Sequence, residues 1–221
     1  MDYDWNFRVV IQSLPFLLSG LKYTILVSVL SMFFGSVLGL FITLARQPHV
    51  KWINRLSQIY VGFFRGTPLL MQLLWAYYSL PMITGIALSS VTTGVLALSL
   101  NLSAFISEIF RAGIQSIGRD QRDAALALGM NGDQVLRRIV LPQALRRIIP
   151  PLGSVWVSLF KDTSLVSVVV IKEMTYQANA LNIETYRPVE VYTVLAVLYF
   201  LLTYPQARLV DLIYARFRVS N

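Results

Sequence analysis

The sequence predicts an all-α integral membrane protein with five transmembrane helices, N-terminus outside and C-terminus in the cytoplasm, in one domain over residues 1–221. Composition gives the class: hydrophobic residues make up 56% of the chain and charged residues only 14%, whereas soluble domains carry about 25% charged residues. Five segments are also long and apolar enough to cross a bilayer, which takes about 20 helical residues. No linker, repeat or low-complexity tract divides the chain.

The five expected spans lie at 23–45, about 67–86, 91–110, 151–171 and 189–207. The first is uncharged throughout. Residues 4–18 are too short and too broken by Pro15 to cross the membrane, and we expect them to form a helix on its outer surface. The sequence therefore predicts a surface helix followed by five crossings.

Two of the expected spans carry residues that would shape their packing. Ser31, Gly35 and Gly39 place small side chains four residues apart in the first span, which permits close contact with another helix. Pro68 and Pro81 would kink the second span, because proline removes a backbone hydrogen bond of the helix.

Basic residues predict the orientation, because Lys and Arg are retained on the cytoplasmic side. With five spans, the loops after the first and third share a side with the C-terminus. Those segments hold 14 of the 19 basic residues: Arg46, Lys51, Arg55, Arg65, Arg111, Arg119, Arg122, Arg137, Arg138, Arg146, Arg147, Arg208, Arg216 and Arg218. The net charge of +8 thus reports topology, and nucleic acid is not expected as a partner.

Several classes of site are excluded by residue counts. The chain has no cysteine and a single histidine, His49, so disulfides, thiolate metal sites and histidine clusters are ruled out. We expect no metal, no cofactor and no catalytic residues. The N-terminus opens with Asp2 and Asp4 instead of a basic segment, so no cleavable signal peptide is expected.

Residues 115–150 are too polar to insert into the membrane, and they contain too many helix-favouring residues for an irregular loop. The alanine-rich run 123–128 has high helix propensity, and Gly129 can adopt the left-handed conformation that ends a helix. Ala124, Ala125 and Leu128 would form a small flat face, with Asp123 beside it. This segment is expected to be the first helix of a cytoplasmic hairpin.

The second half of the hairpin carries its own signals. Asn131-Gly132 marks a turn, and Asp133 is placed to cap the next helix. Pro142 fits the first turn of a further helix, 143–149, because its missing N–H is not needed there. Two short helices joined by a turn are therefore expected before the fourth span.

The spacing of this segment resembles the EAA loop of ABC-importer permeases, in which Glu-Ala-Ala, Gly and Ile-x-Leu-Pro recur at fixed intervals. The matching positions are Ala124, Ala125, Gly129, Ile139, Leu141 and Pro142, with Asp123 in place of the usual Glu. Asp123 keeps the carboxylate but shortens its reach by one methylene. The usual Gly-Gln before the loop is replaced by Asp120-Gln121.

Further blocks resemble the polar amino-acid permeases of the histidine, glutamine and cystine type. They are 64–69 (FRGTPL), 108–114 (EIFRAGI), 141–144 (LPQA) and 161–165 (KDTSL). The resemblance covers nearly the whole chain and implies a type I importer permease (MetI-like) fold in a bacterial inner membrane.

The resemblance also implies partners and roles. Two ATPase subunits would grip paired hairpins, a second permease chain (identical or paralogous) would complete the path, and an extracytoplasmic binding protein would deliver a polar amino acid. The ATPase-coupling residues would be Asp123, Ala124, Ala125, Gly129, Ile139, Leu141 and Pro142. This chain itself lacks the G-x-x-x-x-G-K-[ST] phosphate loop, so ATPase activity is expected on the partner.

Polar residues inside the spans are costly and point to functional sites. Lys161, Asp162, Thr163 and Ser164 follow one another in the fourth span, where a local break would give the two hydroxyls backbone groups to bind. They either line the substrate path or form a structural network between helices. Asn101 and Glu108 are the other candidates for the path.

Glu108 and Arg111 are three residues apart and can pair on one helix face, either as an interfacial ion pair or as part of a gate. At the level of function, two other classes compete with the importer. An ATP-independent carrier or channel subunit would not need the hairpin. An intramembrane enzyme would need convergent catalytic groups, and the polar residues of the spans match no known dyad spacing.

Overall fold

A computed structural model describes residues 3–46 and 51–217 of the chain, and Asp2, His49 and Arg218 lie outside that part. The regular elements of the described residues are all helical. In chain order they are α1 (Phe7–Gln12), α2 (Leu14–Ser19), α3 (Leu21–Ala45), α4 (Lys51–Gly66), α5 (Leu69–Leu74), the π-helix η1 (Trp75–Ser79), α6 (Leu80–Thr84), α7 (Ser90–Gln115), α8 (Arg119–Ala127), α9 (Gly132–Gln134), the π-helix η2 (Val135–Val140), α10 (Leu141–Asp162), the 3₁₀-helix η3 (Thr163–Val169), α11 (Met174–Thr185) and α12 (Pro188–Phe217).

Four helical runs in the described residues are long and apolar enough to cross a membrane. They are Leu14–Ala45, Ser90–Gln115, Gly132–Val169 and Pro188–Arg216. These confirm the apolar helices expected at 23–45, 91–110, 151–171 and 189–207. The expected crossing at 67–86 is not among them, so the count of five spans stays a prediction.

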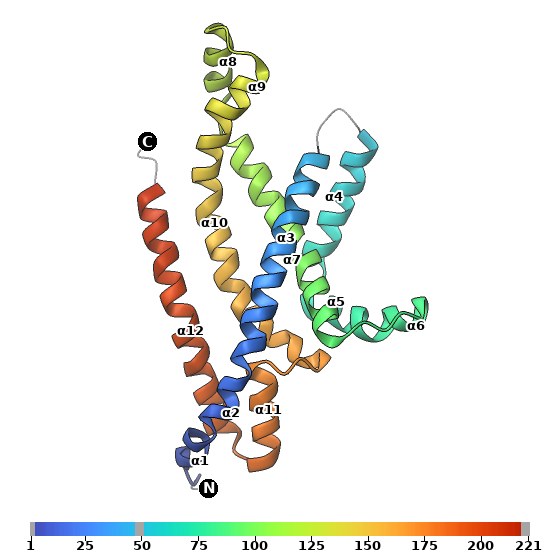
Figure 1. Ribbon diagram of the computed structural model, residues 1–221, viewed down its shortest axis with the longest axis vertical. Helices are drawn as coiled ribbons and strands as arrows, with labels where there is room; N and C mark the ends of the chain where they lie inside the picture. The colour runs from blue at the N-terminus through green and yellow to red at the C-terminus, as the bar shows by residue number, and fades with distance from the viewer. Residues whose placement is uncertain (1–2, 47–50, 218–221) are drawn as a thin grey trace.

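The region expected to form the second span is instead interrupted. Pro68 takes an extended conformation with φ −62° and ψ 134° and separates α4 from α5. The chain then passes through η1 into α6, whose first turn holds Pro81, and Figure 1 shows α6 turned away from the axes of the long helices. The two prolines therefore break this region more thoroughly than the expected kinks.

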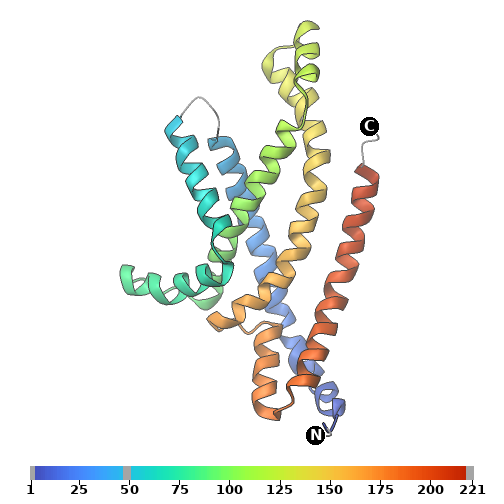
Figure 2. The same ribbon diagram turned by 180° about the vertical axis from the view of Figure 1, so that it is seen from behind.

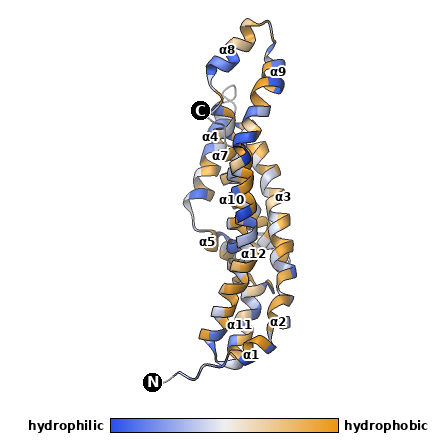
Figure 3. Cartoon of the chain, turned by 90° about the vertical axis from the view of Figure 1, so that its left-hand side faces the viewer, coloured by the Kyte–Doolittle hydropathy of each residue, from blue (hydrophilic) through white to orange (hydrophobic). Residues whose placement is uncertain are grey.

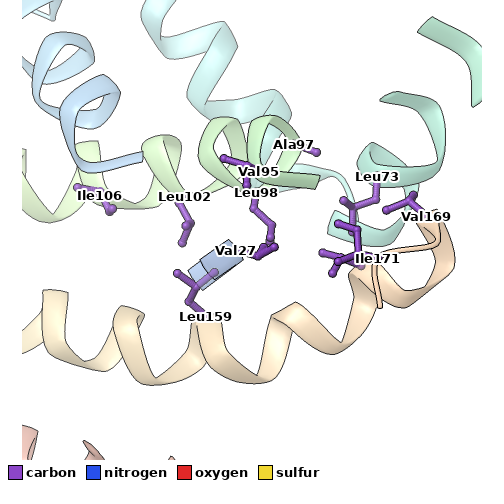
Figure 4. Packing of buried hydrophobic residues seen from close by; sticks show 11 residues of the cluster. Val27, Leu73, Val95, Ala97, Leu98, Leu102, Ile106, Leu159, Val169 and Ile171 are labelled. Carbon is purple, nitrogen blue, oxygen red and sulfur yellow. The ribbon is translucent and has the colours of Figure 1, made fainter. Parts of the chain in front are cut away.

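The main core lies between α3 and α7, with α5, α10 and η3 around it. Figure 4 shows that Leu98, Leu102 and Ile106 lie on the side of α7 that faces Val27 of α3 and Leu159 of α10. The close approach depends on small residues: a Cβ added at Gly35 would lie 2.9 Å from the Leu102 Cβ, and one at Gly39 would lie 3.0 Å from the Ile106 Cγ2. The predicted contact of the small-residue face is confirmed.

Residues 4–18 form two short helices, α1 and α2, with Pro15 in the first turn of α2. This confirms the expected helix but in two pieces, and α2 continues through Gly20 into the first long run. A second core joins α1, α2, α11 and α12. Glu190 accepts bonds there from the Tyr3 hydroxyl and the Asn6 N–H, so the N-terminal segment is attached to the start of α12.

The hairpin of α8 and α9 lies at the end of the molecule that also holds the C-terminal end of α12, and the N-terminus lies at the opposite end (Figure 1). The view from behind shows the same order (Figure 2). Hydrophilic residues gather in the hairpin, whereas the long helices below it are mostly apolar (Figure 3). The polar hairpin therefore extends beyond the apolar part of the helices.

Candidate functional site

The first helix of the hairpin ends as the sequence predicts. Gly129 has φ +80°, a left-handed conformation that costs a residue with a Cβ about 1–2 kcal/mol. The Met130 N–H bonds the Ala125 carbonyl at 3.2 Å, and the Gly129 N–H bonds the Leu126 carbonyl at 2.9 Å. This pair of bonds is a Schellman motif, which fixes the direction in which the chain leaves α8.

The second helix is capped by a residue other than the expected one. The Asn131 side chain accepts from the Gln134 N–H at 2.9 Å, and the Gln134 side chain accepts from the Asn131 N–H at 3.0 Å. This capping box satisfies two N–H groups at once. The prediction for Asp133 was wrong: it lies inside the helix and pairs with Arg137 at 2.9 Å.

The second helix is also longer than expected. α9, η2, α10 and η3 form one uninterrupted helical run, Gly132–Val169, that includes the fourth apolar helix. Pro142 lies in the first turn of α10, directly after the π-helical turns of η2. Instead of a separate helix at 143–149, one continuous helix connects the second half of the hairpin to the apolar part of α10.

The hairpin has its own apolar core. Ala125 is 4% exposed and packs with Ile117, Val135 and the first turns of α10. Of the three residues expected to form a small flat face, Ala124 and Leu128 are exposed whereas Ala125 is buried, where its methyl group holds the two helices together. Ile139 packs against the edge of the same core.

The outer surface of the hairpin keeps the other predicted residues. Asp123 and Ala124 are exposed, and Leu128, beside the turn, is 84% exposed. Leu126 is also exposed, which the motif spacing does not predict. Leu141 and Pro142 are exposed further along, at the start of α10. The hairpin thus presents exposed apolar side chains on an otherwise polar element.

Glu108 lies near the end of α7 that faces the hairpin. Its carboxylate pairs with Arg111 at 2.6 Å, which confirms the predicted pair, and also with Arg46 at the end of α3. No local spacing indicates Arg46 as a partner of Glu108, because the two residues are 62 positions apart. The carboxylate therefore binds guanidinium groups from two helices and ties α3 to α7.

Asn101 is 8% exposed and lies next to the break between α4 and α5. Its Nδ2 donates to the Phe64 carbonyl at 3.0 Å and to the Gln72 Oε1 at 3.1 Å. Pro68 stands four residues after Phe64 and has no N–H to offer that carbonyl. The amides of Asn101 and Gln72 take its place, so Asn101 holds the broken helix against α7.

The cluster 161–164 lies where α10 changes into η3. The Thr163 hydroxyl donates to the Phe160 carbonyl and the Ser164 hydroxyl to the Lys161 carbonyl, both at 2.7 Å. Instead of the expected break, the helix changes from α to 3₁₀ at Thr163 without interruption, and both hydroxyls bind backbone carbonyls as expected. Lys161 is exposed and Asp162 half-buried, and no ion pair joins them in the described part of the chain.

The structure thus separates the predicted residues into three places. The predicted coupling residues lie on the hairpin and at the start of α10. Asn101 and Glu108 lie about two turns apart on α7, and residues 161–164 span the change from α10 to η3. Arg65, expected in a cytoplasmic loop, instead lies in the last turn of α4 with its guanidinium 5.4 Å from the Phe105 ring centroid. The FRGTPL block contained this residue, but nothing in the spacing indicated its neighbour.

Comparison with known proteins gives a consistent result. Residues 9–219 match the family described as binding-protein-dependent transport system inner membrane component. The chain is 36% identical over 199 residues to the probable amino-acid ABC transporter permease protein YckA of Bacillus subtilis, which covers 90% of this chain and 88% of the relative. It is 35% identical over 205 residues to the glutamine transport system permease protein GlnP of Escherichia coli, covering 92% of each.

Solved structures agree with the sequence relatives. A chain of a crystal structure of an amino acid ABC transporter with histidines superimposes with a TM-score of 0.92 and 36% identity, covering 97% of this chain and 100% of that chain. A chain of the MetNI methionine ABC transporter matches in fold, with a TM-score of 0.76 and 20% identity. The protein described here belongs to the family of binding-protein-dependent transport system inner membrane components, as a multi-pass permease of the bacterial inner membrane.

Proposed function

We propose that the chain is the transmembrane permease subunit of an ATP-driven importer for polar amino acids, in which a separate ATPase subunit hydrolyses the ATP. The observation that carries this proposal is the α8–α9 hairpin. It has its own core, extends beyond the apolar helices and continues without a joint into α10. The amino-acid relatives and the solved amino acid transporter support the substrate class.

The hairpin can transmit movement because it is rigid at both helix ends. The Schellman motif at Gly129 and the capping box at Asn131 fix its turn. Moving a two-state transporter from 1:99 to 99:1 takes about 5.5 kcal/mol of differential binding. A partner that binds Leu128 and its neighbours would apply that energy to α10 through the short turn at 129–131, which these two motifs fix and which leads into the continuous run Gly132–Val169.

The mechanism then follows from the partners that the family implies. Two ATPase subunits would close around ATP and draw two hairpins together, one from this chain and one from a second permease subunit, identical or paralogous. The helices would rock from inward-open to outward-open, and an extracytoplasmic binding protein would deliver the amino acid. This arrangement places the hairpin in the cytoplasm and the N-terminus outside, with five crossings.

Substitution of Leu128 tests the coupling surface without touching the core, because this side chain is 84% exposed. Leu128→Asp should reduce co-purification with the cognate ATPase and ATP-driven uptake in proteoliposomes by about tenfold or more, the effect of losing a contact of at least 1.4 kcal/mol. Leu128→Met keeps an apolar side chain and should retain both. Normal ATPase binding and uptake in Leu128→Asp would remove the coupling role, and uptake that survives ATP depletion would favour an ATP-independent carrier.

A further inference from the structure

A groove follows the half of α7 that faces the hairpin and is bordered by the end of α4 and the middle of α10. Its volume is about 460 Å³. Three charged side chains line it, one from each helix: Arg65, Glu108 and Arg147. Phe105, Ile109 and Val155 contribute an apolar wall. The groove is therefore neither a purely apolar slot nor a simple basic patch.

Arg65 lies at the end of this groove that is farther from the hairpin. Its guanidinium lies 5.4 Å from the ring centroid of Phe105, which is ten residues before the end of α7, or about 15 Å along the helix axis. Arg65 is exposed in the single chain, beside the apolar run Ser90–Gln115. A guanidinium along such a run is costly in hydrocarbon, and charged groups there face water-filled paths or binding sites. Among the residues that the structure describes, Arg65 forms no ion pair.

The other charges leave the groove positive. Glu108 is already bound by Arg46 and Arg111, so its single negative charge meets two positive ones. Arg147, at the end nearer the hairpin, donates to the Ser116 carbonyl at 2.5 Å. It has no carboxylate partner within residues 3–46 and 51–217. The groove thus has a guanidinium at each end and an ion-paired carboxylate between them.

We propose that Arg65 receives the α-carboxylate of the amino acid as it leaves toward the cytoplasm, and that Arg147 provides the second carboxylate-binding point at the mouth of the groove. A planar guanidinium matches a carboxylate with two parallel hydrogen bonds. Glu108, between the two arginines, is the one carboxylate among the residues that line the groove, so the substrate ammonium would lie near it. This inference rests on the proposed function and adds a residue that sets the substrate class.

A lipid fits the groove less well than a small zwitterion. An anionic headgroup at Arg147 would direct its acyl chains toward Arg65, where they would surround a guanidinium with hydrocarbon. A free amino acid carries its charges within a few ångströms of each other and leaves water around both arginines. The charges at both ends of the groove therefore favour a small carboxylate.

The natural lack of cysteine allows a direct test of the charge in the groove. Ala112 lines the groove and is exposed, so Ala112→Cys places a single thiol there. Its reaction rates are measured with two thiosulfonate reagents of similar size, one carrying an anionic sulfonate and the other a cationic ammonium, on the permease–ATPase complex in nanodiscs of zwitterionic lipid. The anionic reagent should react faster, and Arg65→Gln should lower the anion-to-cation rate ratio by on the order of tenfold.

Arg65→Lys is the matched control, since it keeps the charge and should keep most of the ratio. In the intact importer, ATP-driven uptake of a radiolabelled amino-acid mixture should fall strongly in Arg65→Gln and less in Arg65→Lys. An unchanged rate ratio in Arg65→Gln, or unchanged uptake, would overturn the inference. Loss of the anion preference on adding phosphatidylglycerol would also overturn it, because a lipid headgroup would then occupy the site.

The two readouts separate this inference from the proposed function. The rate ratio depends only on the charges in the groove and is measured without transport. Absence of ATP-driven uptake in the unmodified complex would contradict the proposed function, whereas a ratio that does not respond to Arg65 contradicts the role of Arg65 alone.

Discussion

At the scale of single residues, Asn101 shows how one amide can compensate for a proline some thirty positions away. Asn101→Leu keeps the number and branching of the side-chain heavy atoms but leaves the Phe64 carbonyl with one donor fewer and the Gln72 Oε1 without this donor. We expect a loss of about 1–3 kcal/mol in stability, the cost of burying unsatisfied polar groups. Thermal unfolding in detergent measures it.

Asn54 provides the control for this substitution, because it makes an exposed bond to Gln58 within α4. Asn54→Leu should shift the melting temperature little, since exposed substitutions usually stay within about 0.5 kcal/mol. Equal melting temperatures of Asn101→Leu and wild type would show that the amide is not structural, and would leave the substrate path as its role.

At the scale of elements, the contact between α3 and α7 depends on the absence of a Cβ. Gly35→Ala would place a methyl carbon 2.9 Å from the Leu102 Cβ, and overpacking of this kind costs about 1–3 kcal/mol. Gly62→Ala in α4 meets nothing within 4 Å and should gain about 0.5–1 kcal/mol from helix propensity. Opposite shifts in melting temperature are expected, and a gain at both positions would contradict the close packing.

The start of α11 offers a second test, at Glu173, between the runs Gly132–Val169 and Pro188–Arg216. Its carboxylate is fully buried and accepts from the Thr175 and Tyr176 N–H groups at 2.8 and 2.7 Å and from the Tyr199 hydroxyl at 2.8 Å. Burial raises the pKa of Glu173 above its usual value. The folded state therefore gains stability when this carboxyl is protonated, although the hydrogen bonds of the cap by themselves favour the carboxylate.

The direction of the pH dependence of stability follows from proton linkage. A carboxyl whose folded pKa is raised contributes stability below its unfolded pKa, and that contribution is lost as the pH rises through the folded pKa. Lowering the pH from about 7 to about 5 should raise the wild-type melting temperature relative to Glu173→Gln, which cannot titrate. Glu173→Ala should lose about 1 kcal/mol at both pH values, because the cap is removed. Parallel pH profiles of wild type and Glu173→Gln would refute the linkage.

The elements that the sequence could predict are those with local signals. Gly129 ends α8 because its backbone freedom is a property of the residue itself, and the first apolar helix has no charge to interrupt it. The cap at Asn131 could have been found from the Asn-x-x-Gln spacing, but Asp133 was preferred on residue type. The continuity of α9 with α10 was hidden because Pro142 suggested a new helix, and a π-helical turn has no sequence signature.

At the scale of the whole molecule, the sequence predicted the class and the apolar helices, but not how residues from different helices meet. The Arg46–Glu108 pair and the groove at Arg65 join positions tens of residues apart, and such contacts depend on packing that no spacing encodes. The region 67–86 was expected to span because its mean composition is apolar. Pro68, Pro81 and the π-helix between them changed its path.

The orientation of the molecule is a prediction at this largest scale, and it follows from the separation of its ends. The hairpin and the C-terminal end of α12 lie at one end and the N-terminus at the other (Figure 1), and the hairpin helices carry Arg119, Arg122, Arg137 and Arg138. A cysteine at Leu128, which is 84% exposed, or at Ile183, which is 70% exposed, would be the only thiol of the chain. Lys and Arg are retained inside, so a membrane-impermeant maleimide should label Ile183→Cys in intact cells and Leu128→Cys only after permeabilisation. The reverse pattern would place the hairpin outside, out of reach of any cytoplasmic ATPase, and labelling of both from one side would contradict the separation of the two ends across the membrane.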